Sequence, residues 1–600
     1  MLTVWDWAVI ALFIVTSLFI GFSFAKRAGK GLESYFLSGR SVPWWLAGIS
    51  IAASHFSASF PIKVTDLVRR EGVNGNWVHW YHVCGIVIGA LFFAGLWRRA
   101  GIITDNELQE LRYSGAGAKT LRVFHVVWSG LIMNAFWLGM SLIAMEKISG
   151  VIFPNFKPEN VIIIACVIAL IYTIFSGLYG VIATDLFQFL LATTGSVMIV
   201  IIVLAKLGWP GDVETRIAEG VANISANVES GQSIGNSATT NFIGDPSEFT
   251  AITPSLKDNW KVISFILFLT ILPLMGGAQG GYQVQRVMAT KNERHAMLSL
   301  LTLSYLQNGV ILVLWTIIGL GSLVLLPNLV DGQTAYPLMG ITFLPIVFKG
   351  IFVASILAAL MSTVDTHLNF AASYIVNDGY KRFINPNAPE KHYVYVSWIT
   401  MVGVGLFSYL MWLFIMRGGN ILDNFRKVMI FFGGAGLVGA LKWYWWRVNA
   451  WAEIAAIMSS GLITFFLGTK YPEFTKEYYA IGLVVTAFGA AIVWLTVILL
   501  TKPTEKERLV RFYERIQPPG PGWGPIRKIA NTLPRDGFTK YDLVAWACAI
   551  ASIYCFTFGM LKLLLGHLLF AAILLVLAFI TGVIMVRALS TKHSWKNEEV

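Results

Sequence analysis

Long apolar runs dominate this sequence and limit it to one broad class of fold. About fifteen of them are long enough to cross the hydrocarbon core of a bilayer, which takes about 20 helical residues. They lie at 5–24, 42–64, 73–97, 121–146, 160–176, 180–205, 260–285, 297–326, 344–376, 393–415, 421–442, 450–468, 478–499, 541–562 and 563–586. In hydrocarbon a helix satisfies its backbone N–H and C=O groups within one segment. The chain is therefore predicted to be an all-α polytopic membrane protein that lies in a lipid bilayer.

Composition agrees with this class and argues against an enzyme. Only 13% of the residues are charged, whereas soluble domains carry about 25%. The cysteines Cys84, Cys166, Cys548 and Cys555 lie in apolar runs, without the spacing of metal ligands or of a disulfide framework. No nucleophile–base set, metal cluster or phosphate-binding G-x-x-x-x-G-K-[ST] motif is recognised, so neither an enzyme nor an ATP-driven pump is expected.

The formal net charge of +12 does not indicate a nucleic-acid partner, because the cations gather in alternate loops. Lys and Arg follow the first and third apolar runs and fill residues 500–540, whereas loops 207–258 and 327–343 carry few. Cation-rich loops of membrane proteins are cytoplasmic. The N-terminus is therefore expected outside and the C-terminus inside, in what we expect to be a bacterial inner (plasma) membrane.

Two of the apolar runs are interrupted near their middle. Run 42–64 has a small, hydroxylated centre followed by Pro61, and run 260–285 holds Pro273, Gly276, Gly277, Gly280 and Gly281. Glycine and proline alone often merely kink membrane helices. Each interrupted run opens a set of five, however, and a matched pair in two halves is typical of a transporter site. Unwound backbone there can coordinate a cation or a polar solute.

This reading divides the chain into consecutive segments. They are an N-terminal extra helix and linker (1–41), a first repeat of five helices (42–206), an external loop (207–259), a second repeat of five helices (260–442), two extra helices (443–499), a cytoplasmic loop (500–540), and C-terminal helices with a tail (541–600).

Four motifs, in order along residues 1–500, resemble those of the sodium/solute symporter family, which includes the sodium–glucose cotransporters. They are ESYFLSGRSVPWWLAGISIAAS (33–54), SGLYGVIATDLFQFLL (176–191), YQVQRVMATKNERHA (282–296) and LAALMSTVDTHLNFAASYIVNDGYKRF (357–383). The resemblance implies a LeuT-type five-plus-five inverted repeat, with one N-terminal and about four C-terminal extra helices. It also implies sodium-coupled symport of a small organic solute, sugar or organic-acid-like, by alternating access.

The resemblance also implies a sodium site. Carried over residue by residue, it consists of the backbone carbonyls of Ala53, Phe56 and Ala359 and the hydroxyls of Ser362 and Thr363. Oxygen ligands of this kind suit a hard cation. The alternative for the two hydroxyls is a hydrogen bond to their own helix.

Some relatives hold a second sodium ion, and that position maps to Asp185, Asp365 and Thr366. Family members often have serine where this chain has Asp365. Two neighbouring carboxylates do not both ionise without a cation or a shared proton. The sequence thus leaves two couplings open, a second sodium ion or a proton carried by Asp185 and Asp365.

Candidate solute-binding residues flank the two interruptions. They are His55, Phe60, Lys63, His79, Trp80, Gln279, Tyr282 and Gln283. Tyr282 matches a family aromatic that closes the inner side below the substrate. His79 has a second reading, in an interfacial aromatic belt, and Lys63 another, reaching out to water. The amide and carboxylate pattern of sugar-transporting relatives is not reproduced, which leaves sugars, sugar acids, other carboxylates, nucleosides and amino-acid-like solutes open.

A third function, that of a transporter-like membrane sensor, is disfavoured. Such proteins usually append a signalling domain, and the sequence shows no such domain after residue 586.

Overall fold

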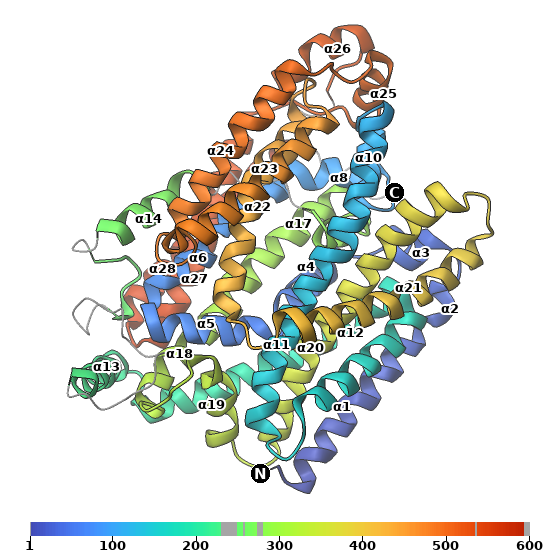
Figure 1. The fold of residues 1–600 in the computed structure, drawn as a ribbon. Helices are drawn as coiled ribbons and strands as arrows, with labels where there is room; N and C mark the ends of the chain where they lie inside the picture. Colours follow the sequence, from blue (N-terminus) through green and yellow to red (C-terminus); the bar gives the residue numbers. More distant parts are fainter. Residues whose placement is uncertain (1, 230–248, 256–258, 273–279, 535–536, 593–600) are drawn as a thin grey trace.

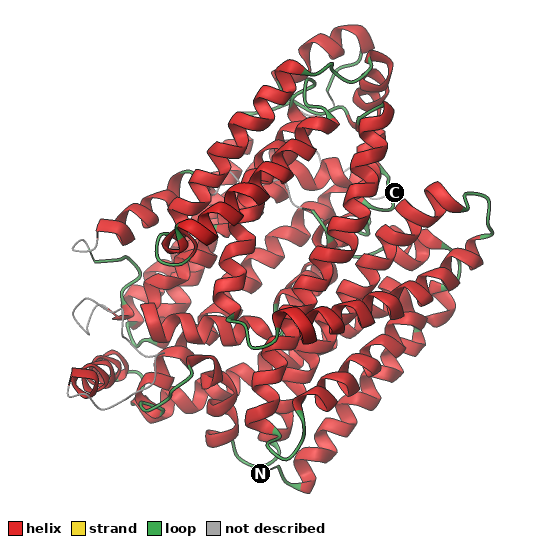
Figure 2. Ribbon diagram, viewed as in Figure 1, coloured by secondary structure: helices red, strands yellow, loops and turns green. Residues whose placement is uncertain are grey.

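The computed structural model confirms an all-α membrane protein. It describes residues 2–229, 249–255, 259–272, 280–534 and 537–592. Helices joined by loops make up almost all of this part of the chain (Figure 2). Within it, 11 helices are long and apolar enough to cross a membrane. Each remaining predicted run is helical too, either as an interrupted helix, as part of a longer bent helix, or as the charged helix α22.

The first predicted repeat begins with two short consecutive helices, α4 (Trp44–His55) and α5 (Ser59–Glu71). It continues with α6 Trp77–Trp80, α7 His82–Ile88, α8 Ala94–Ala100, α10 Gly115–His125, α11 Asn134–Ile152 and α12 Pro158–Leu207. α12 covers two predicted runs because the chain bends inside it. Gly177 has φ 54° and ψ −160° there, a conformation that essentially only glycine adopts.

Replacing Gly177 by alanine is expected to lower the melting temperature of the protein. A side chain at this backbone conformation is strained by about 1–3 kcal/mol. Gly403→Ala is the matched control, because Gly403 lies in a regular helix and an added Cβ there meets nothing within 4 Å. Equal melting temperatures for the two variants in detergent would contradict the role assigned to the bend.

The second predicted repeat also opens with two short described helices, α14 (Asn259–Thr270) and α16 (Tyr282–Met288). It continues with α17 Glu293–Ser304, α18 Leu312–Leu325, α20 Phe348–Ser373, α21 Glu390–Met411 and α22 Ile421–Tyr444. α1 Val4–Ser23 precedes both repeats, and the four long helices that follow them are α23 Ala450–Lys470, α24 Tyr479–Leu500, α27 Lys540–Leu564 and α28 Leu568–Lys592. The predicted numbers of extra helices at the two ends are therefore confirmed.

Helix α20 lies at the centre of the molecule and is buried along most of its length. It packs against α12, α1, α21, α11 and α4. Its start is held by Asp6 of α1, whose Oδ1 accepts the backbone N–H groups of Val347 and Gly350, each at 2.9 Å. The central helix, which carries the predicted cation ligands, is thus fixed at one end by the N-terminal helix.

The two interrupted helices are joined at one end. Just before α4, the Val42 N–H donates to the Ala289 carbonyl at 3.1 Å, and the Val42 carbonyl accepts the Lys291 N–H at 3.1 Å. These two bonds form an isolated bridge between the start of α4 and the end of α16.

The polar segments between the long helices contain short helices of their own. α25 (Lys506–Ile516) and α26 (Gly524–Ala530) lie toward the upper right of Figure 1, far from the N-terminus, α13 and α19 (Ala335–Phe343). α13, over Val213–Glu229, lies in the segment that the sequence predicts to be an external loop. Val213, Ile217 and Val221 recur every four residues and are buried, and α13 packs against α18.

Candidate functional site

The first interrupted helix ends and restarts inside the protein. α4 ends at His55 and α5 begins at Ser59. Between them the Phe56 N–H donates to the Ala53 carbonyl at 3.1 Å, and both of these residues are buried. The interruption therefore lies where the sequence predicts it.

Of the second predicted interruption the structure describes the two flanks, since α14 ends at Thr270 and α16 begins at Tyr282. Pro273, Gly276, Gly277 and the candidate solute residue Gln279 lie outside the described residues. Gly281, with φ 69°, donates its N–H to Asp105 Oδ2 at 2.8 Å. The other oxygen of Asp105 accepts the Tyr374 hydroxyl at 2.7 Å. Asp105, which is not among the predicted site residues, thus links the residue before α16 to Tyr374.

Asp185 is the centre of a buried network that joins four helices. Its carboxylate accepts the hydroxyl of Ser50 from α4 at 2.6 Å and that of Ser362 from α20 at 2.5 Å. The guanidinium of Arg286 from α16 lies 3.9 Å away, and both charged side chains have 0% exposure. A charge buried this completely needs a partner, and Arg286 is the partner of Asp185.

Arg286 also reaches the last turn of α4 and the middle of α20. It donates to the hydroxyls of Thr366 at 2.7 Å and Ser50 at 3.3 Å, and Thr366 bonds to the Ser54 hydroxyl at 2.8 Å. Arg286 is the fifth residue of the motif YQVQRVMATKNERHA and is not among the predicted site residues. A cation that directly follows an interrupted apolar run is the signal that could have identified it.

Asp365 has a different environment from Asp185. Its Oδ2 accepts the Tyr172 hydroxyl at 2.7 Å, and its Oδ1 has no hydrogen-bond partner among the described residues. In that same part of the chain no hydrogen bond joins Asp365 to Asp185. With Arg286 beside Asp185, two ionised carboxylates and one guanidinium leave one negative charge. One monovalent cation or one proton would balance this negative charge.

The predicted sodium ligands fall into two groups. On α20, Ala359, Ser362 and Thr363 lie within about one turn, and the Thr363 hydroxyl donates to the Ala359 carbonyl at 2.9 Å. Ala53 and Phe56 lie at the end of α4, which packs against α20. Thr363 thus has the own-helix bond of the alternative reading, whereas Ser362 reaches across to Asp185. The ligand set stays a prediction.

Three candidate solute residues from both interruptions lie together. The amide nitrogen of Gln283 lies 2.6 Å from His55 Nε2, and donation by the amide makes that ring nitrogen an acceptor. The ring of Tyr282 lies 5.9 Å from that of His55 and 5.5 Å from that of His367. These contacts bring the end of α4 and the start of α16 to one place.

A second group of candidates lies further along α5. The ammonium of Lys63 lies 4.1 Å from the ring centre of Phe60 and 3.4 Å from that of Phe425 on α22. The His79 ring contacts both phenylalanines, at 5.0 Å and 5.7 Å. Trp80 is not part of this group, since it stacks edge-on against Phe558 of the C-terminal helix α27 at 5.1 Å.

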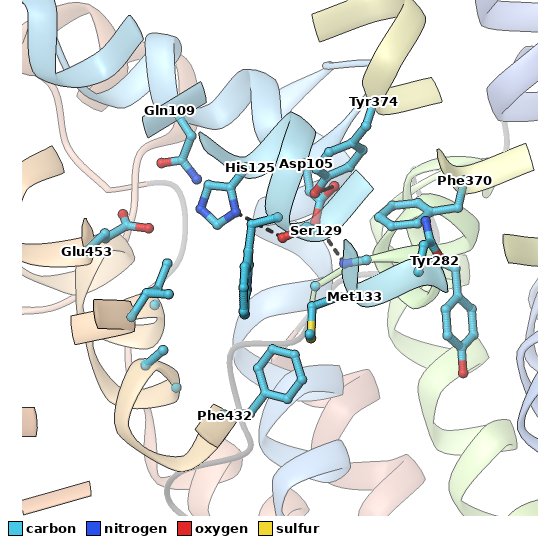
Figure 3. A pocket seen from close by; sticks show the side chains of 18 of the residues that line it. Asp105, Gln109, His125, Ser129, Met133, Tyr282, Phe370, Tyr374, Phe432 and Glu453 are labelled. Carbon is cyan, nitrogen blue, oxygen red and sulfur yellow. Dashed lines mark hydrogen bonds between the residues drawn. The ribbon is translucent and has the colours of Figure 1, made fainter. Parts of the chain in front are cut away.

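A cavity of about 410 Å³ begins at Tyr282 and His367. Figure 3 shows Tyr282 and Phe370 at one end and Gln109, His125 and Glu453 at the other. His125 and Gln109 each keep a buried polar atom without a partner among the described residues. The cavity extends to His125 at the end of α10.

Comparisons with known proteins agree with this architecture. The sodium/glucose cotransporter 4 of Danio rerio is 23% identical over 90% of this chain and 86% of its own length. The sodium/glucose cotransporter of Vibrio parahaemolyticus is 23% identical over 76% of this chain and 82% of its own.

A solved structure shares the fold. The substrate-bound, outward-open structure of a Na⁺-coupled sialic acid symporter matches with a TM-score of 0.64 and 20% identity, over 84% of this chain and 99% of its own. It supports the predicted LeuT-type inverted repeat. The model of the sodium:solute symporter family matches residues 35–460. From this match and the architecture above, the chain belongs to the sodium:solute symporter family.

Proposed function

We propose that this protein moves a small organic solute, sugar or organic-acid-like, across the membrane together with sodium by alternating access. The observation that carries the proposal is the interruption between α4 and α5. It puts the buried backbone of Ala53 and Phe56 next to Ser54. The Ser54 hydroxyl bonds to Thr366, which belongs to the network around Asp185 and Arg286. An interrupted membrane helix at this depth is tolerated where its freed backbone lines a site.

In this proposal the first sodium ion binds to the carbonyls of Ala53, Phe56 and Ala359 and to the hydroxyls of Ser362 and Thr363. The Ser362 hydroxyl already touches the Asp185 carboxylate at 2.5 Å, so a cation at Ser362 lies close to a negative charge. A sodium ion that moves down about 100 mV gains about 2.3 kcal/mol. That energy is enough to concentrate a neutral solute about 50-fold.

The solute in this proposal binds between the two interruptions. His55 and Gln283 offer hydrogen bonds, and Tyr282 separates the solute from the cavity that leads away from it. The further candidates are Phe60, Lys63, His79, Trp80 and Gln279. With the cavity on the cytoplasmic side of Tyr282, solute leaves past Tyr282 and His367 when that pair of rings opens.

The proposed orientation has the N-terminus outside and the C-terminus inside, in a bacterial inner membrane. The separation of the cation-rich α25 and α26 from the N-terminal end in Figure 1 supports the orientation, because cation-rich loops stay in the cytoplasm.

Uptake into proteoliposomes tests the proposal. Purified protein is given an inward sodium gradient and a panel of radiolabelled sugars and organic acids, with choline replacing sodium in the control. We expect at least one solute to accumulate above its external concentration only with the sodium gradient. Uptake that merely equilibrates, with or without sodium, would overturn symport.

A proton-coupled symporter is the second candidate, favoured by the Oδ1 atom of Asp365 that lacks a partner among the described residues. Uptake into the same proteoliposomes distinguishes sodium-coupled from proton-coupled symport. Accumulation driven by an inward pH gradient in sodium-free buffer, and lost in Asp365→Asn, supports the proton. No accumulation under that gradient excludes it.

A further inference from the structure

Lys63 is a buried cation held by aromatic rings. It lies on α5 with 4% exposure, and its ammonium lies over Phe60 at 4.1 Å and Phe425 at 3.4 Å. An aromatic face attracts an ammonium group, but more weakly than a hydrogen-bonded carboxylate does. The rings therefore hold Lys63 in place without neutralising its charge.

The nearby acidic side chains do not neutralise Lys63 either. α5 contains two acidic residues, and each is paired with an arginine: Asp66 with Arg70 and Glu71 with Arg426, both at 2.8 Å. Lys63 forms no hydrogen bond or ion pair with any residue that the structure describes. The ammonium form of a buried lysine needs an anionic partner, and a bound carboxylate would supply one.

A second polar group faces the same rings. His79 is 3% exposed and contacts both Phe60 and Phe425. Its Nε2 atom is buried without a hydrogen-bond partner among the described residues. Next to Lys63, this nitrogen suits a hydroxyl or a carboxylate oxygen of a bound molecule.

We propose that Lys63 binds the carboxylate of the transported solute, and that this solute is a sugar acid, a hydroxylated molecule with one carboxylate. The inference rests on the function proposed above and names its substrate class. Lys63 exchanges the ring of Phe425 for the carboxylate when the solute enters, while His79 binds an oxygen beside it.

The other end of the site fits the hydroxylated end of such a molecule. The side-chain nitrogens of His55 and Gln283 lie 2.6 Å apart at the interruption. His55 comes eight residues before Lys63 along the chain. Eight helical residues rise about 12 Å, and the interruption replaces part of that helix. A six-carbon acid with hydrogen bonds at both ends suits a separation of about this length. Lys63 and the His55–Gln283 pair thus recognise opposite ends of one solute.

Binding to the purified full-length protein tests this assignment, with melting temperature in sodium buffer as the readout. The probes are glucuronate, galacturonate and gluconate, each next to its neutral counterpart glucose, galactose or sorbitol. We expect at least one acid to bind about 100-fold more tightly than its neutral counterpart, as for other buried charge pairs. Lys63→Met should lose that preference, and Lys63→Arg should keep most of it.

Lys206→Met is the matched control, because the Lys206 ammonium also lies over a ring, that of Phe343 at 5.3 Å, but on an exposed part of α12. It should retain the preference for the acid. The melting temperature without probe shows whether Lys63→Met folds, which we expect because methionine fills similar space without a charge.

Several results would overturn the assignment. They are equal binding of acid and neutral probes, no binding of any of the three acids, or an unchanged preference in Lys63→Met. Sodium-driven uptake of a neutral sugar alone would leave the symport proposal intact and contradict the role of Lys63. Binding of an acid through Lys63, without any sodium-driven accumulation of that acid, would support Lys63 and contradict symport.

Discussion

Arg286→Met should destabilise this protein by about 3–5 kcal/mol, the usual result of leaving one member of a buried ion pair without its partner. Asp185 would remain at 0% exposure with no guanidinium 3.9 Å away. Thr366 and Ser50 would lose their donor as well. The measurement is the melting temperature in detergent, and sodium-driven uptake should fall with it.

A double variant and a surface variant test whether the loss of stability comes from the pair of Arg286 and Asp185. Asp185→Asn combined with Arg286→Met removes both charges, so it should recover much of the stability lost in Arg286→Met. Arg382→Met is the control, because Arg382 is 46% exposed in its pair with Glu110, and exposed pairs contribute about 0–1 kcal/mol. If the double variant melts no higher than the single one, the pairing of Arg286 with Asp185 is not what stabilises the network.

Removing either predicted sodium-binding hydroxyl should weaken sodium dependence strongly. Ser362→Ala and Thr363→Val each delete one of about five oxygen ligands. We expect the sodium concentration for half-maximal uptake to rise roughly 10–100-fold, the range for losing groups that support a metal ion. The measurement is solute uptake at increasing sodium concentration and constant membrane potential.

Ser355→Ala is the control for these two variants. Ser355 is buried on the same helix, and its hydroxyl bonds to the Phe352 carbonyl of its own helix at 2.6 Å. It should leave the sodium dependence unchanged. If Thr363→Val behaves like this control while Ser362→Ala does not, Thr363 serves only the bond to Ala359 that is seen in the structure. Unchanged sodium dependence in both variants would reject the site.

The long helices and the first interruption could be predicted from the sequence because both follow from local rules. Apolar length alone specifies a span, and a small, hydroxylated stretch before Pro61 marks where α4 ends. α13 was missed although its apolar residues recur every four positions, because the segment from 207 to 258 as a whole is rich in Asn, Ser and Gly. Its helix depends on packing against α18, which lies about a hundred residues further along the chain.

The partners within the site could not be predicted in the same way. Asp185 and Asp365 are both acidic and buried, but only packing decides that Arg286 lies beside the first and Tyr172 beside the second. The partner of Trp80 could not be predicted either, since its ring packs against Phe558 rather than against Lys63 on α5. Residue type indicates what a side chain can bind, whereas the choice of neighbour depends on contacts between distant segments.

The bridge at Val42 has a mechanical consequence for coupling. Because Val42 bonds to both Ala289 and Lys291, the start of α4 is tied to the end of α16, so a tilt of one helix strains its bonds to the other. In the proposed transport cycle, a sodium ion bound at the end of α4 would therefore act on α16, whose Tyr282 and Gln283 belong to the proposed solute site. This pair of hydrogen bonds would then be a short mechanical link between the proposed ion site and the proposed solute site.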